Sequence, residues 1–264
     1  MPPTGTLGEL TAASHERAAI VAARVHELRA AVRDLPPPPP FAQTLRGSTV
    51  RVIAEVKRSS PSKGVIALNL DAAAQAAEYV NGGAAAISVL TEPQRFGGSL
   101  TDLRDVTRQV TVPVIRKDFL VHPVQLWEAR LAGASAVLLI VRALSPELLR
   151  ELMDAMAETG LEVLVEIRDE RELDLALQVN AQVIGVNNRN LESLVIDPST
   201  APRIIPLIPR HCVAVAESGM RKKGDVLPSA LAGADAILVG SAISASHDPA
   251  TAVRALSSIR RHER

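Results

Sequence analysis

One pattern recurs along this chain of 264 residues: GAAAISVL at residues 83–90, GASAVLLI at 133–140 and GADAILVG at 233–240. In each copy a Gly-Ala pair and a small residue come directly before a short apolar run. A weaker copy starts at Asn180. Glycine readily adopts the left-handed backbone that ends a helix. Each copy therefore predicts a helix end followed at once by a buried strand.

The chain contains eight short apolar runs rich in β-branched residues, and each copy of the pattern ends in one of them. They cover residues 50–56, 85–90, 112–116, 136–141, 162–167, 183–186, 213–216 and 236–239. The runs are continuous rather than alternating, which is typical of parallel strands buried on both faces. Segments of helical length separate them. Eight such units predict an α/β fold, a (β/α)8 TIM barrel. About six units would have favoured a doubly wound sheet, and no GxGxxG motif opens a helix.

The barrel is expected over residues 47–264, preceded by a helical extension and proline-rich connector over residues 1–46, with one domain overall. An approximate apolar stripe predicts helix through the first 35 residues, and five prolines at 36–40 end it. An SH3-type ligand is the alternative interpretation of the prolines, and a connector is favoured.

Composition excludes several classes of protein. The chain is 47% hydrophobic and 22% charged, which is globular rather than disordered. It has five aromatic residues and a net charge of zero. We therefore expect neither a surface that stacks nucleic-acid bases nor one that binds anionic membranes. One cysteine, Cys212, precludes an intramolecular disulfide, and the histidines lack ligand spacing, so no metal is expected. Without a secretory signal or a long apolar run, a cytoplasmic protein is expected.

Polar residues gather where the expected strands end, and in a barrel these ends form one mouth. A buried ionisable group is costly unless it is paired or used, and a structural ion pair remains the alternative for any one of them. Closely spaced lysines and glutamates are what general acid–base chemistry requires. The candidates from these ends are Glu55, Lys57, Phe96, Lys117, Phe119, Glu166, Asn187, Arg189, Glu217 and Ser218.

The last two strand ends predict a phosphate site. Ser218-Gly219 and Gly240-Ser241 offer small residues with exposed backbone N–H groups, where barrels commonly bind phosphate. Arg189 could add a charge-assisted contact to a phosphate or a carboxylate.

Several motifs resemble those of the indole-3-glycerol phosphate synthase family. They are AEVKRSSPSKG at 54–64, ISVLTEPQRFGGSL at 87–100, RKDF at 116–119, LVEIRDERELDLAL at 164–177, IGVNNRNL at 184–191, VAESGM at 215–220 and ADAILVGSAI at 234–243. The resemblance implies a lyase of tryptophan biosynthesis. It converts 1-(2-carboxyphenylamino)-1-deoxyribulose 5-phosphate, a small-molecule substrate, into indole-3-glycerol phosphate, carbon dioxide and water. No cofactor is implied, and we expect a monomer or a weak homo-oligomer.

The resemblance also implies catalytic roles. Lys117 would be the general acid that activates the ketone, and Lys57 would bind the carboxylate. Glu166 would exchange protons during dehydration, and Glu55 would pair with the lysines.

Further residues would bind the substrate. Asn187 and Glu217 would orient its hydroxyl and carboxylate groups, with Ser60 and Ser218 nearby. Ser241 stands where many family members have an acidic residue, but its hydroxyl and N–H remain available. The phosphate would be held by Gly219, Gly240 and Ser241, with Arg189 nearby, and the ring pocket would be lined by Phe96 and Phe119.

Two alternatives stay open on the sequence. One is another phosphate-binding barrel enzyme, similar to phosphoribosylanthranilate isomerase, which would more naturally use a Cys/Asp pair. The other is a non-catalytic barrel that binds a phosphate ester.

Overall fold

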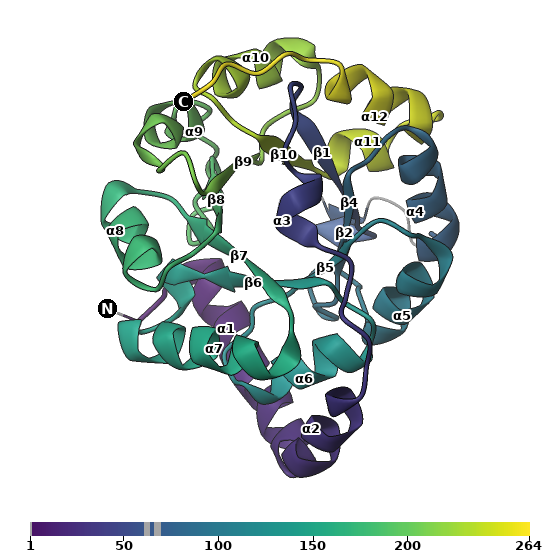
Figure 1. Ribbon diagram of the computed structural model, residues 1–264, viewed down its shortest axis with the longest axis vertical. Helices are drawn as coiled ribbons and strands as arrows, with labels where there is room; N and C mark the ends of the chain where they lie inside the picture. Colours follow the sequence, from purple (N-terminus) through teal and green to yellow (C-terminus); the bar gives the residue numbers. More distant parts are fainter. Residues whose placement is uncertain (1, 61–63, 66–69) are drawn as a thin grey trace.

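A computed structural model describes residues 2–60, 64–65 and 70–264, without the side chains of Ser60 and Val65. Eight parallel strands in this part of the chain close into a barrel, as the sequence predicts (Figure 1). Around the barrel the order is β1-β10-β9-β8-β7-β6-β5-β4. Their bounds are β1 Arg51–Val56, β4 Ala86–Leu90, β5 Val114–Lys117, β6 Ala136–Ile140, β7 Glu162–Ile167, β8 Val183–Asn187, β9 Val213–Glu217 and β10 Ala236–Val239. A short antiparallel pair that the sequence did not predict, β2 Ser59–Ser60 and β3 Gly64–Val65, follows β1.

Helices alternate with the strands and form the outer ring (Figure 1). Several begin at a capping side chain, as at Asp71, Ser99 and Asp169, which accept backbone N–H groups of the first turn. The repeat glycines have positive φ, including +92° at Gly83 and +94° at Gly233, which confirms the expected helix ends. The bounds are α4 Ala72–Asn81, α5 Leu100–Gln109, α6 Val124–Leu131, η1 Val141–Ala143, α7 Pro146–Thr159, α8 Glu170–Gln178, α9 Thr200–Ile204, η2 Ile205–Leu207, α10 Lys223–Leu231, α11 Ser241–Ser244 and α12 Pro249–Ser257.

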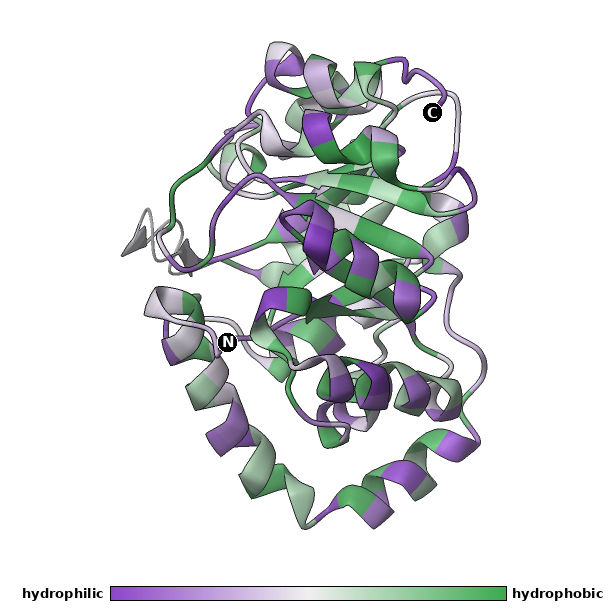
Figure 2. Ribbon diagram, turned by 90° about the vertical axis from the view of Figure 1, so that its left-hand side faces the viewer, coloured by the Kyte–Doolittle hydropathy of each residue, from purple (hydrophilic) through white to green (hydrophobic). Residues whose placement is uncertain are grey.

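The N-terminal extension contains two long helices where the sequence predicted one. Helix α1, Gly5–Ala22, and helix α2, Val25–Arg33, form a V at one side of the barrel (Figure 2). The bend brings both helices against α6, where residues from each share an apolar cluster with Trp127. A straight helix could not bury both apolar faces there, so tertiary packing overrides the continuous helical pattern.

The extension reaches both ends of the barrel. Helix α3, Phe41–Thr44, lies at the N-terminal end of the barrel, where Glu162 at the start of β7 accepts the N–H groups of Phe41 and Ala42. Leu7 and Leu10 of α1 belong to the same buried cluster as the barrel interior. No helix in the described ranges is long and apolar enough to cross a membrane.

Candidate active site

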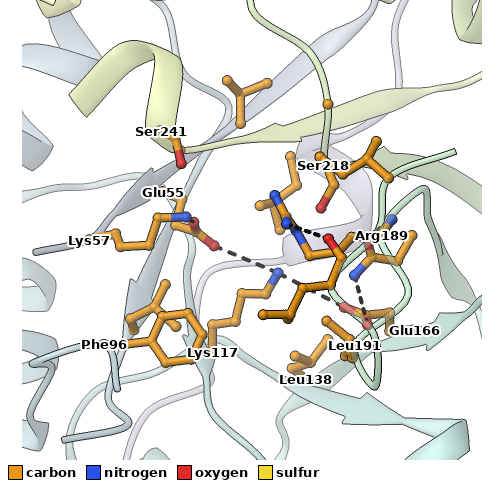
Figure 3. A pocket seen from close by; sticks show the side chains of 18 of the residues that line it. Glu55, Lys57, Phe96, Lys117, Leu138, Glu166, Arg189, Leu191, Ser218 and Ser241 are labelled. Atoms are coloured by element: carbon orange, nitrogen blue, oxygen red, sulfur yellow. Dashed lines mark hydrogen bonds and ion pairs between the residues drawn. The ribbon is translucent and has the colours of Figure 1, made fainter. Parts of the chain in front are cut away.

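A cavity of about 150 Å³ lies at the C-terminal ends of the strands, called the mouth below. Its lining joins β1, β5, β7, β8 and the turns after β9 and β10, so residues far apart in sequence meet there. Figure 3 shows the ammonium group of Lys117 near the centre, with Glu55 and Lys57 on one side and Glu166 on the other.

Lys117, the last residue of β5, lies among three carboxylates of the described side chains. Its Nζ is 3.0 Å from Oε2 of Glu217, 3.6 Å from Oε2 of Glu55 and 3.9 Å from Oε2 of Glu166. Burial disfavours the charged amine, but the three carboxylates outweigh it and raise the pKa of Lys117 above its ordinary range. Lys117 therefore keeps its positive charge in a poorly solvated mouth.

Glu55, near the end of β1, forms a second ion pair with Lys57, the first residue after that strand. Nζ of Lys57 lies 2.5 Å from Oε1 of Glu55. Burial works to raise the pKa of Glu55, but Lys57 and then Lys117 outweigh it and lower that pKa. A Cβ at Gly240 would overlap Oε1 of Glu55, so the absence of a side chain there gives the carboxylate its room.

Glu166 has the opposite protonation behaviour. Burial and the nearby charge of Glu217 raise its pKa to about 8, against the lowering effects of Lys117 and a hydrogen bond from Asn187. Nδ2 of Asn187 donates to Oε1 of Glu166 at 3.0 Å. At neutral pH Glu166 therefore holds a proton that it can give away.

Glu217 has an acceptor to spare. It is fully buried, and its Oε1 has no hydrogen-bond partner among the described residues. A Cβ at Gly185 would overlap this oxygen, so the glycine leaves space for it. Since a buried unpaired acceptor is costly, Oε1 is suited to receive a hydrogen bond from a bound molecule.

The turns after β9 and β10 form another part of the same cavity. Ser218 has φ +65° and Gly219 has φ +87°, and both line the cavity with Gly240 and Ser241. Arg189 reaches this cavity from the turn after β8, and its Nη1 donates to the carbonyl of Leu194 at 2.9 Å. Small residues and a guanidinium therefore meet where the sequence predicted an anion site.

Two aromatic rings line another wall of the cavity. The ring centroids of Phe96 and Phe119 are 6.2 Å apart, with an interplanar angle of 36°. Thr6 and Leu10 of α1 also line the cavity. This wall can receive a flat apolar group.

The structure brings together the candidate residues whose side chains it describes. Ser60 is the exception, because its side chain lies outside the described part. The sequence reasoning missed the contribution of α1 and the turn residues Leu191, Leu194 and Ile196. Local pattern gives no signal for α1, since its contact depends on how the extension returns to the mouth. Among the described residues there is no group of three or more His, Cys, Asp or Glu side chains arranged to hold a metal ion.

These features define a class of protein: a (β/α)8 barrel whose mouth gathers buried lysines and glutamates beside an expected anion site. Solved structures support the fold alone. A 3-hexulose-6-phosphate synthase from Salmonella typhimurium superposes with a TM-score of 0.64 at 18% identity, over 79% of this chain and 97% of that one.

The particular family follows from sequence comparison. The family model described as indole-3-glycerol phosphate synthase matches residues 9–256. The indole-3-glycerol phosphate synthase 1 of Streptomyces coelicolor is 53% identical over 83% of this chain and 81% of its own length. The indole-3-glycerol phosphate synthase of a Nocardioides species is 49% identical over 88% of this chain and 90% of its own length.

The chain belongs to the indole-3-glycerol phosphate synthase family. The expected activity is thereby confirmed: the chain is a carboxy-lyase of tryptophan biosynthesis that acts on a small molecule. Neither alternative, the isomerase-like barrel or the non-catalytic barrel, is supported.

Proposed function

We propose that Lys117 is the general acid that closes the pyrrole ring. The supporting observation is the position of its Nζ within 4 Å of three buried carboxylates. Attack of the anthranilate ring carbon on the ketone carbon turns the ketone oxygen into an alkoxide. The alkoxide is a very strong base, so it takes a proton even from an amine whose pKa is raised. A preorganised cation at this point stabilises the developing charge.

Lys57 holds the substrate carboxylate in this proposal. Glu55 keeps the Lys57 ammonium at the edge of the cavity through the 2.5 Å contact, and the side chain remains partly exposed there. The C–C bond to the carboxylate then breaks, its electron pair returns to the ring, and carbon dioxide leaves.

Glu166 completes the reaction by dehydration. Its proton, held at neutral pH by a pKa of about 8, passes to the departing hydroxyl group, which leaves as water. The Glu166 carboxylate then takes a proton from the adjacent CH2 carbon of the new ring, which makes that ring aromatic, and Lys117 recovers its proton from solvent. Asn187 orients Glu166 through the 3.0 Å hydrogen bond, and the unpaired Oε1 of Glu217 accepts from a substrate hydroxyl. The atoms balance as indole-3-glycerol phosphate, carbon dioxide and water.

The remaining candidates bind the ends of the substrate. Gly219, Gly240 and Ser241, with Arg189 and Ser218 beside them, hold the phosphate in this proposal. Phe96 and Phe119 receive the anthranilate ring. The proposal also includes Ser60 near the substrate, action in the cytoplasm without a cofactor, and a monomer or weak homo-oligomer.

Replacing Lys117 tests the central role. Lys117→Ala should abolish ring closure, as measured by indole absorbance, while substrate binding remains measurable. Lys117→Arg should not restore turnover, because arginine keeps its charge but does not give up its proton. Lys223→Ala, which removes an exposed lysine at the start of α10, is the matched control. Near-normal kcat in Lys117→Ala, or full rescue by arginine, would contradict the proposed role.

A further inference from the structure

Arg17, in the middle of α1, reaches across to two buried carboxylates at the mouth. Its Nη2 lies 2.6 Å from Oδ1 of Asp118, and its Nη1 lies 3.5 Å from Oε1 of Glu92. The Arg17 side chain is about one-quarter exposed, whereas those of Asp118 and Glu92 are 1% and 0% exposed. The extension thus supplies a cation to the barrel between β4 and β5.

Glu92 fixes the turn that carries Phe96. Its carboxylate accepts the backbone N–H groups of Gln94, Arg95 and Phe96 at 2.9, 2.7 and 3.0 Å. Three such bonds leave the turn little freedom, so the position of the Phe96 ring depends on where the Glu92 carboxylate is held.

Asp118 does the same for the other ring. It follows Lys117 directly, and its Oδ1 accepts the N–H of Phe119 at 2.8 Å. Its Oδ2 accepts from Thr91 Oγ1 at 2.8 Å and lies 3.4 Å from Nη2 of Arg116. Arg116 is itself shared with Glu128, so Asp118 depends on two cations for its charge.

From these contacts we infer that Arg17 is a positioning residue for the substrate's aromatic ring. By joining Asp118 to Glu92, it sets the spacing of the Phe96 and Phe119 rings, 6.2 Å apart, and so makes the N-terminal extension part of the ring site. The inference goes beyond the roles proposed above, and rests on them only in placing the anthranilate ring against this pair. A planar guanidinium suits this position because its fork can contact two carboxylates at once.

A purely structural role, that of fastening α1 to the barrel, predicts a different result. Other contacts already fasten the extension. Arg29 of α2 forms an ion pair with Glu158 at 2.5 Å and stacks over Trp127 at 5.2 Å. An exposed pair, Glu9 to Arg95 at 2.7 Å, links the same helix α1 to the same turn as Arg17 does. Glu9→Gln is therefore a matched control.

The experiment compares two probes on the full chain and the variants Arg17→Met, Arg17→Lys and Glu9→Gln. One probe is a non-reacting substrate analogue with its ketone reduced to an alcohol, and the other is ribulose 5-phosphate, which lacks the ring. Calorimetric titration gives both affinities without catalysis, so the result is independent of the role proposed for Lys117. Turnover assays give kcat and KM separately.

Arg17→Met should lower the affinity for the ring-bearing analogue about tenfold, because displaced Phe96 and Phe119 rings contact its aromatic ring less well. The affinity for ribulose 5-phosphate, which has no such ring, should stay within about twofold of that of the unchanged chain. KM should rise more than kcat falls. Arg17→Lys keeps the positive charge but lacks the forked guanidinium, so its affinity for the ring-bearing analogue should fall about threefold. This variant tests the inference even if Arg17→Met does not fold. Glu9→Gln should change neither affinity. Unchanged affinity for the analogue in both Arg17 variants, or equal losses for the two probes, would overturn the inference.

Discussion

Replacing the buried carboxyl of Glu166 by an amide should stabilise the folded chain, and the gain should grow with pH. The pKa of this carboxyl rises from an ordinary 4.5 to about 8 in the folded state, because of burial first and Glu217 second. Between these two values the unfolded chain has lost the proton and the folded chain still holds it. Stability of the unchanged chain therefore falls as pH rises through this window, by about 1.4 kcal/mol per pH unit.

The size of the gain follows from the same numbers. From 4.5 to about 8 is about 3.5 pH units, so the full difference is about 5 kcal/mol above pH 8 and about 3 kcal/mol at pH 7. Glu166→Gln stays neutral at every pH, and its amide oxygen can still accept the hydrogen bond from Asn187. The variant should match the unchanged chain near pH 4.5 and exceed it increasingly above. Its turnover should fall by about 10²- to 10⁴-fold, as expected for loss of an acid–base group.

Urea unfolding followed by circular dichroism between pH 5.5 and 9 measures the effect. Glu78→Gln, which changes an exposed carboxylate on α4, is the matched control and should give a small difference that does not vary with pH. The reasoning would be refuted by a Glu166→Gln gain that is the same at pH 5.5 and pH 8.5, or by a variant that is less stable than the unchanged chain at pH 8.

Three further changes test other parts of the structure. Arg189→Met should raise KM for the phosphorylated substrate by about tenfold, because it removes a charge-assisted contact beside the expected phosphate site. A steady-state titration measures KM, and an unchanged KM would contradict this role. Gly185→Ala should lower kcat by at least about tenfold, because its methyl group would displace Oε1 of Glu217; crystal structures and rates of the variant check both parts. Asp235→Asn should cost about 3 kcal/mol of stability by unpairing buried Asp235 from Arg261, while kcat at 25 °C stays normal, as paired unfolding and turnover measurements can test.

Much of the fold could be predicted because its signals are local. A Gly-Ala pair before an apolar run marks a helix end and a strand start within a few residues, and positive φ values such as +91° at Gly133 confirm this. The bend between α1 and α2 could not be predicted in the same way. It depends on contact with Trp127, about a hundred residues further along the chain, and the two residues between the helices, Ala23 and Arg24, are not helix breakers.

The site divides along the same line. Lys117 and the glutamates could be predicted from the sequence, because they stand at the ends of strands and barrel topology brings these ends together regardless of the loops between them. Arg17 had no such rule to reveal it. Its partner Asp118 is 101 residues away, and only the path of the extension shows that they meet.

Protonation is the property of the site that depends most on geometry. Two lysines, Lys57 and Lys117, and three glutamates, Glu55, Glu166 and Glu217, form one contact cluster in the mouth. Fully ionised, this cluster would carry one excess negative charge in a poorly solvated space, while Arg189 of the same cavity donates to the carbonyl of Leu194. Burial penalises that excess, and a proton on one carboxylate removes it. Glu55 keeps its charge because both lysines contact it, whereas Glu166 lies furthest from the Lys117 ammonium, at 3.9 Å, and close enough to Glu217 to be repelled. The proton therefore settles on Glu166, the residue that would need it for dehydration.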